Sequence, residues 1–296
     1  MRLAKVRAMS ASTEHNPQPG SSEQKNPLAV TGGSLEESKE ALAIAETDGL
    51  IFITRRLFCT VGVHPTRCKE FEESGDPKKH FQALLALAKE GIQKGKVVAI
   101  GECGLDYDRL HFCPPEVQKK YFEKQFELAY ATKLPMFLHM RAAAEDFCEI
   151  MERNINKFTS GVTHSFTGSA EDRDKLLSFH NMYIGVNGCS LKMAENLDVV
   201  RGIPVERMMI ETDSPYCEIK STHAGINFVK SLWPSKKKEK YDKECPVKGR
   251  NEPCLVLRVK LLFPVKIVKC TVNDIPVDIS FNQTAGLSAL CFLEKV

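Results

Sequence analysis

The chain has 296 residues, a mass of 33.1 kDa and 43% hydrophobic residues, enough for one barrel-sized domain with a sizeable core. Its 41 Lys and Arg residues against 38 Asp and Glu give a formal net charge of only +3, so the whole chain is not a general polyanion binder. The 11 Cys residues form no Cys-x-x-Cys pair, which favours reduced thiols in the nucleus or cytoplasm over a disulfide framework. No apolar stretch reaches the ~18–20 residues that a membrane helix needs, so we expect no membrane partner.

The first residues differ in composition from the rest. Residues 1–27 are rich in Ser, Pro, Gln, Asn and Gly without apolar periodicity, and we expect a disordered leader. Residues 28–33 look like the end of a strand. Ser34 and Glu37 then form a capping-box pattern that predicts a helix running to Glu46. Further helices are predicted over residues 77–94, 114–132, 142–154, 169–179 and 195–202.

Six short apolar runs lie between or beside these helices, and each ends in a residue able to bind a metal or a phosphate. They are residues 60–64, 97–102, 135–139, 162–164, 183–187 and 208–213. Such alternation predicts parallel strands joined by crossover helices. In a closed (β/α) barrel the C-terminal strand ends converge on one face, where active sites lie. The sequence therefore predicts an α/β fold of the TIM-barrel type with a metal centre at that face.

Four residues at these strand ends are the candidate metal ligands. Glu102 stands in a glycine-flanked segment and can bridge two ions, although a helix-capping role explains it equally well. A single His at a strand end is more often a hydrogen-bonded rim residue, but His139 and His164 together with Glu102 favour a metal centre. Neutral imidazoles and carboxylates suit Zn, Mn or Mg ions. Asp213, before Ser214 and a proline, is either a ligand that orients a bound water or a turn residue.

Other polar groups near the strand ends have weaker interpretations. His64 precedes Pro65 and either contacts a substrate or is a rim histidine in a turn. Asn187 is explained by a turn. The run Lys236–Lys238 could steer DNA phosphates, although most such runs are solvated loops.

The motifs in this order resemble the TatD family of metal-dependent deoxyribonucleases, and in particular its eukaryotic branch. The resemblance covers about residues 28 to 259 and rests on several short motifs. They are Gly-Val-His-Pro at 62–65, Gly-Glu-Cys-Gly-Leu-Asp at 101–106, Leu-His-Met-Arg at 138–141, Thr-His-Ser-Phe at 163–166, Glu-Thr-Asp-Ser-Pro at 211–215 and Arg-Asn-Glu-Pro at 250–253.

The resemblance implies a metal-dependent hydrolase with DNA as its substrate, a TIM-type barrel and two divalent ions (Mg, Mn or Zn). In such an enzyme a metal-activated water cleaves the phosphodiester bond. By the same resemblance Glu102 bridges the ions, His139 and His164 complete one of them, and Asp213 binds the other and helps to activate water. Glu102 and Asp213 are thus the catalytic candidates. The positions that match substrate phosphate contacts in the family are His64, Arg141 and Arg250.

The chain departs from the family at both ends. Family members begin with a strand that carries His-x-His or Asp-x-Gly-x-Asn, and nothing before Leu28 resembles it, since His15 has no apolar run beside it. Residues 53–59 look like an insertion. Beyond about residue 259 the family's closing helices are replaced by strand-like pieces at 259–263, 265–270 and 277–281. We therefore expect a leader at 1–27, a barrel at 28–259 that lacks its first strand, and a divergent tail at 260–296.

The missing strand leaves the level of activity open. Losing its ligands predicts one lost or weakened ion and a low-activity variant of the nuclease. A catalytically inactive interaction protein is the alternative from another class. An amidohydrolase-type metal hydrolase shares the barrel, but it often bridges its ions with a carboxylated Lys where this chain has Glu102. We expect a monomer, and the sequence names no protein partner.

Overall fold

The computed structural model describes residues 6–8, 28–47, 57–229, 234–242, 245–255, 266–272 and 275–281. Most of the predicted leader, part of the predicted tail, the strand-like piece at 259–263 and the first half of the predicted insertion lie outside these ranges. Within the described ranges no helix is long and apolar enough to cross a membrane.

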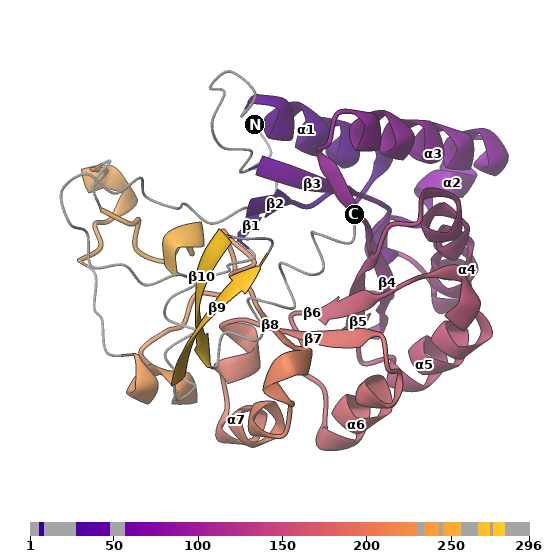
Figure 1. The fold of residues 1–296 in the computed structure, drawn as a ribbon. Coiled ribbons are helices and arrows are strands. Elements are labelled where there is room, and N and C mark those ends of the chain that lie inside the picture. The colour runs from indigo at the N-terminus through magenta and orange to yellow at the C-terminus, as the bar shows by residue number, and fades with distance from the viewer. Residues whose placement is uncertain are drawn as a thin grey trace.

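Among the described residues, eight strands form the main sheet, and their spatial order follows the chain (Figure 1). They are β1 (Val6–Ala8), β2 (Leu28–Val30), β3 (Leu57–Val61), β4 (Val97–Asp106), β5 (Met136–Arg141), β6 (Gly161–His164), β7 (Met182–Val186) and β8 (Met208–Ile210). From β2 to β8 every neighbouring pair is parallel, whereas β1 pairs antiparallel with β2. The predicted class of fold is confirmed. The seven parallel strands curl into part of a barrel, and β1 occupies the edge where a first parallel strand would lie.

In the described part of the chain, seven α-helices cover the outside of the curled sheet (Figure 1). They are α1 (Leu35–Glu46), α2 (Glu70–Glu73), α3 (Pro77–Gln93), α4 (Pro115–Thr132), α5 (Ala144–Arg153), α6 (Ala170–Ser178) and α7 (Ala194–Arg201). The predicted ranges agree with α1 and α3 to α7 within two residues at each end. Capping explains several starts, because the Ser34 side chain accepts from the Glu37 amide at 3.0 Å and Ser169 forms a reciprocal capping box with Asp172.

Short elements complete the described chain. The 3₁₀ helices are η2 (Pro65–Arg67), η3 (Tyr107–Arg109), η4 (Ile155–Lys157), η5 (Cys189–Leu191), η6 (Val205–Arg207), η7 (Ala224–Phe228), η8 (Lys238–Lys240) and η9 (Pro253–Leu255). In the tail, β9 (Lys266–Val272) and β10 (Ile275–Phe281) pair antiparallel as a separate two-stranded sheet. Two of the three predicted strand-like pieces of the tail are therefore strands.

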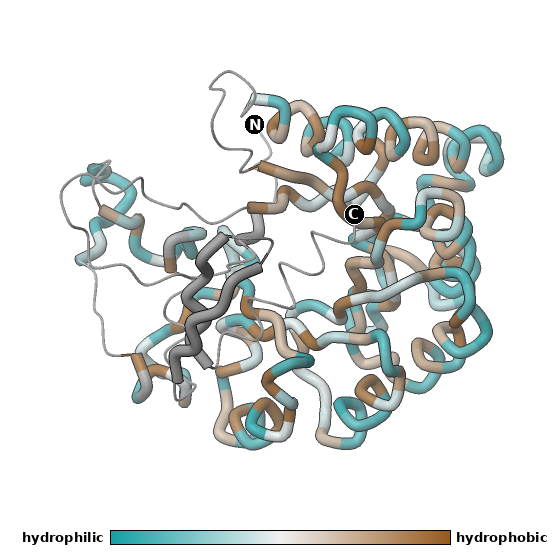
Figure 2. Tube along the Cα trace, in the orientation of Figure 1, coloured by the Kyte–Doolittle hydropathy of each residue, from teal (hydrophilic) through white to brown (hydrophobic). Residues whose placement is uncertain are grey.

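The core has two parts because successive strand residues face opposite sides of the sheet. The larger part lies between strands and helices, and Figure 2 shows the matching pattern of apolar strands and helices with polar outer faces. The smaller part is a cluster of Ala99, Phe137, Val162 and Met209, with Tyr183 packed beside it. Its members come from five successive strands, so they fill the inner face of the curled sheet.

The packing of α4 against α5 gives a first prediction. Phe122 is fully buried and its ring centroid lies 5.1 Å from those of Phe126 and Phe147. Phe122→Ala should lower the free energy of unfolding by ~3–5 kcal/mol, through lost transfer energy and the cavity left behind. Urea denaturation followed by circular dichroism measures the effect. Tyr130→Ala on the same helix, at a side chain 53% exposed, is the control and should change stability little. Equal stability of the Phe122→Ala variant and the wild type would contradict this packing.

Candidate metal centre

The ends of three neighbouring strands bring a carboxylate and two imidazoles together. His139 and His164 lie two residues beyond the inner-face residues Phe137 and Val162, so they project from the same face at the strand ends. Glu102 reaches this face from β4, where the register against β5 shifts between Ile100 and Cys103. The ring of His164 also stacks on that of Phe137, with centroids 4.8 Å apart.

Glu102 is the common partner of these groups. Its Oε1 lies 2.7 Å from His164 Nε2 and 3.1 Å from His139 Nδ1, and those two nitrogens are 3.1 Å apart. Glu102 and His164 are almost completely buried. Three of the four predicted ligands therefore converge on one point.

This arrangement fits a divalent cation. Glu102, His139 and His164 form one group of donor atoms that all lie within 4.8 Å of one another, and His64, Asp106 and His139 form a second. Two imidazole nitrogens that face the same carboxylate oxygen place three lone pairs around one centre. Asp106 Oδ1 is a further buried oxygen, with no hydrogen-bond partner among the described residues. Nitrogen and oxygen donors of this kind suit Zn, Mn or Mg.

Two glycines allow β4 to carry these side chains so close to β5. Gly101 and Gly104 have φ values of +137° and +143°, which side chains rarely adopt. A Cβ on Gly101 would lie 2.0 Å from the Phe137 carbonyl oxygen, and one on Gly104 would lie 1.9 Å from that of His139. The pattern Gly-Glu-Cys-Gly is therefore a requirement of the backbone around Glu102.

Asp213 is in the same cavity but does not join either group of donor atoms. The cavity has a volume of about 650 Å³, and Asp213 lines it together with Glu102, His139 and His164. The residue follows β8 with a left-handed φ of +55°, and Cys217 Sγ lies 3.3 Å from its Oδ2. Its role as a ligand stays a prediction.

The three predicted phosphate contacts lie in different places. His64 is part of the centre, with Nε2 3.5 Å from Glu102 Oε1. Arg141 lines the cavity, and its Nε donates to Asp108 at 2.6 Å. Arg250 pairs with Glu252 at 2.7 Å and is not among the described residues that line the cavity.

The weaker candidates belong to the surroundings. The Asn187 side chain is buried and donates to Ser165 Oγ at 2.9 Å and Glu211 Oε1 at 3.3 Å, so it holds a loop in place. The Lys236 ammonium group pairs with Asp242 at 2.6 Å.

Two carboxylates of the site were missed by the sequence analysis. Asp106 Oδ2 lies 3.2 Å from His139 Nε2. Burial by itself would raise the pKa of Asp106, but His139, Arg109 and Arg141 hold it below its ordinary value, so Asp106 is ionised at neutral pH. Glu211 is 1% exposed and its Oε1 lies 3.6 Å from His164 Nδ1. Because every second residue of a strand faces the same side of the sheet, Glu211 faces the same side as the inner-face residue Met209, and this periodicity could have predicted it.

Asp106 orients the His139 imidazole, and Glu211 lies near the His164 imidazole, beyond hydrogen-bond distance. A carboxylate that contacts one ring nitrogen fixes the tautomer and leaves the other nitrogen for a metal. Asp106 contacts Nε2 of His139 while Nδ1 points to Glu102, whereas Glu211 lies near Nδ1 of His164, whose Nε2 points to Glu102.

Two buried glutamines of α4 hold the backbone beside the centre. Gln125 accepts from the Val63 amide at 2.7 Å and donates to the Val63 carbonyl at 3.0 Å. Gln118 accepts from the Asp106 amide at 2.8 Å, donates to its carbonyl at 3.0 Å and donates to the Cys113 carbonyl at 2.8 Å. The helix thus fixes the segments that carry His64 and Asp106.

Removing one glutamine tests this support. Gln118→Leu leaves buried backbone groups of Asp106 and Cys113 without partners, so the free energy of unfolding should fall by ~1–3 kcal/mol. Thermal denaturation measures the stability, and titration with Mn²⁺ should also show weaker binding, because Asp106 orients His139. Gln82→Leu, at an exposed position of α3, is the matched control. Unchanged stability and unchanged Mn²⁺ affinity in Gln118→Leu would rule out the supporting role.

Comparison with known proteins adds independent findings. The family model described as TatD related DNase matches residues 12–260. The chain is 48% identical over 231 residues to the protein named Deoxyribonuclease Tat-D of Schizosaccharomyces pombe, covering 77% of this chain and 72% of that protein. The protein of the same name in Saccharomyces cerevisiae is 35% identical over 318 residues, covering 80% of this chain and 76% of that protein. The Escherichia coli protein named 3'-5' ssDNA/RNA exonuclease TatD is 34% identical over 194 residues, covering 64% of this chain and 68% of that protein.

Solved structures agree with the fold. A TatD family hydrolase from Entamoeba histolytica matches with a TM-score of 0.72 and 33% identity, covering 90% of this chain and 81% of that one. A Saccharomyces cerevisiae protein described as an uncharacterized amidohydrolase matches with a TM-score of 0.69 and 32% identity, covering 90% of this chain and 85% of that one.

Proposed function

This chain belongs to the TatD family of deoxyribonucleases, and we propose that it hydrolyses DNA phosphodiester bonds with a divalent ion held by Glu102, His139 and His164. The observation that carries this proposal is the convergence of these three side chains on one Glu102 oxygen, at the end of a curled parallel sheet. Glu102 at the position where amidohydrolases often carry a modified Lys supports the nuclease over that alternative.

The chemistry divides between the ion and the protein. A bound divalent ion would lower the pKa of a water molecule and offset the negative charge of the phosphoryl group. The protein orients His139 through its contact with Asp106, and Glu211 lies near His164. Arg141 and Arg109 line the cavity and offer guanidinium groups to phosphate oxygens. We assign to Asp213 the acceptance of a proton from the attacking water, since its carboxylate faces the same cavity.

We propose one strong ion and one weak or absent ion. In the family the ligands of one metal come from the first strand. Here that edge of the sheet is taken by β1, whose sequence Val6-Arg7-Ala8 contains neither His nor a carboxylate. The second group of donors, His64, Asp106 and His139, shares His139 with the first group. A single neutral imidazole does not readily serve two ions, which weakens the second site.

Removing the central carboxylate tests the reaction. Glu102→Ala should lower the rate of Mg²⁺- or Mn²⁺-dependent cleavage of end-labelled DNA by at least ~100-fold, equivalent to ~2.7 kcal/mol of transition-state stabilisation. Glu116→Ala, at an exposed position of α4, should cleave like the wild type. Cleavage that is metal-dependent but equally fast in Glu102→Ala would refute the assignment of the site.

Metal content tests the number of ions. Native mass spectrometry with added Mn²⁺ or Zn²⁺ should show one tightly held ion per wild-type chain, and His164→Ala should lose it. Two equally tight ions in the wild type would contradict the weak second site.

A further inference from the structure

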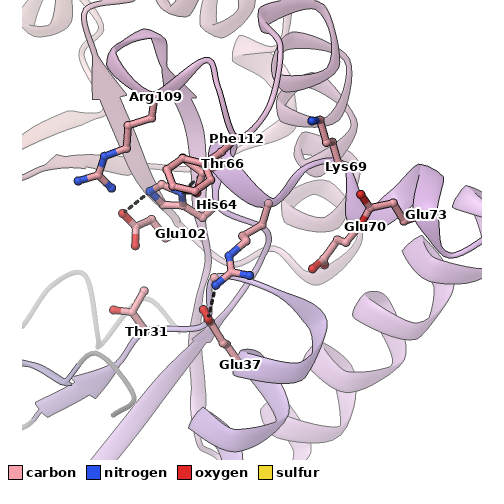
Figure 3. Close-up of a pocket in the computed structure, with 12 residues that line it drawn as sticks. Thr31, Glu37, His64, Thr66, Lys69, Glu70, Glu73, Glu102, Arg109 and Phe112 are labelled. Carbon is pink, nitrogen blue, oxygen red and sulfur yellow. Dashed lines mark hydrogen bonds and ion pairs between the residues drawn. The ribbon is translucent and has the colours of Figure 1, made fainter. Parts of the chain in front are cut away.

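Two cavities border the metal centre and share part of their lining. The first has a volume of about 540 Å³ and the second, which contains Asp213, about 650 Å³. They share three lining residues, His64, Glu102 and Arg109. Figure 3 shows the first cavity, with the His64 imidazole directed at the Glu102 carboxylate and Arg109 beside them. A chain-like substrate bound at the centre therefore has room to extend into both cavities.

Each cavity contains one exposed aromatic ring. Phe112 is 54% exposed and lines the first cavity, and Tyr216 is 56% exposed and lines the second. Phe112 lies between η3 and α4, in the segment that also carries Arg109 (Figure 3). Tyr216 lies in the turn after β8, where its amide donates to the Asp213 carbonyl at 2.8 Å. The two rings therefore line two different cavities, which share His64, Glu102 and Arg109.

Cationic groups accompany both rings. Arg67, Lys69 and Arg109 line the first cavity, and Arg141 and Lys192 line the second along with the shared Arg109. The first cavity is mixed in charge, because Glu37, Glu70, Glu73 and Glu102 also line it, and Glu37 pairs with Arg67 at 3.4 Å and Glu70 with His80 at 2.8 Å. An exposed aromatic ring with cationic side chains nearby is a combination with which proteins bind single-stranded nucleic acid, since bases stack on the ring and phosphates meet the cations.

We propose that Phe112 and Tyr216 are stacking platforms for the two nucleobases on either side of the cleaved phosphate. The proposal rests on the nuclease function proposed above. A base that is paired in a duplex has its faces covered by its neighbours, so the strand has to be unpaired around the cleaved bond. The rings thus make the enzyme select single-stranded substrate locally, without reading the sequence.

A binding experiment with the full-length chain tests this without depending on turnover. The probe is a 5'-fluorescein-labelled single-stranded DNA of mixed sequence, titrated in Ca²⁺ and followed by fluorescence anisotropy. Phe112→Ala and Tyr216→Ala should each weaken binding by roughly 5-fold to 150-fold, the range expected for losing one stacked base. Phe112→Trp and Tyr216→Phe should retain wild-type affinity. Tyr130→Ala, an equally exposed aromatic outside both cavities, is the control.

An abasic probe separates stacking from other causes. On an oligomer of the same length whose sugars carry no bases, the wild type, Phe112→Ala and Tyr216→Ala should bind equally weakly. The proposal is overturned if the alanine variants bind base-bearing DNA as the wild type does, or if they lose the same factor on both probes. Failure of the nuclease function is seen separately, as absence of Glu102-dependent cleavage by the wild type.

Discussion

Burial of the Glu102 carboxylate among imidazoles is the constraint on which the rest of the site depends. One oxygen lies 2.7 to 3.5 Å from nitrogens of His164, His139 and His64, and the side chain has almost no contact with water. A buried charge is costly unless it is compensated. A divalent cation supplies that compensation most completely, because it binds the carboxylate and the neutral imidazoles at once. A cation bound at this position would therefore also stabilise the site.

The sheet meets this requirement by a simple periodicity. Phe137 and Val162 fill the inner face, and the next residues on that face, His139 and His164, reach the strand ends. The apolar layer thus acts as the floor of the cavity. Outside the sheet, Gln118 and Gln125 of α4 fasten the backbone on either side of the centre. The positions of the ligands are consequently fixed by the strands that carry them and by the hydrogen bonds from α4, rather than by loops.

Much of this could be predicted from the sequence, since it depends on local patterns. The apolar runs located the strands, the caps and prolines located the helices, and the strand ends located Glu102, His139 and His164. The remainder depends on contacts between distant segments. Asp106 meets His139 only because the β4–β5 register shifts before Cys103, and the Gln118 contacts require α4 to lie against β4. The role of Arg250 as a phosphate contact stays a prediction, and its guanidinium group pairs with Glu252, two residues away.

The altered N-terminal edge affects the two halves of the site unequally. Glu102, His139 and His164 come from β4, β5 and β6, which are flanked on both sides by paired strands. Changes at the β1 edge reach them only through β2 and β3. Asp213 instead follows β8, the opposite edge of the sheet, which a closed barrel would support from its first strand. Among the described strands β8 pairs with β7 alone, and Asp213 is also the predicted ligand that stands apart from the donor groups. The central ligands thus lie on strands with paired neighbours on both sides, whereas Asp213, the proposed proton acceptor, follows the strand at the other edge of the sheet.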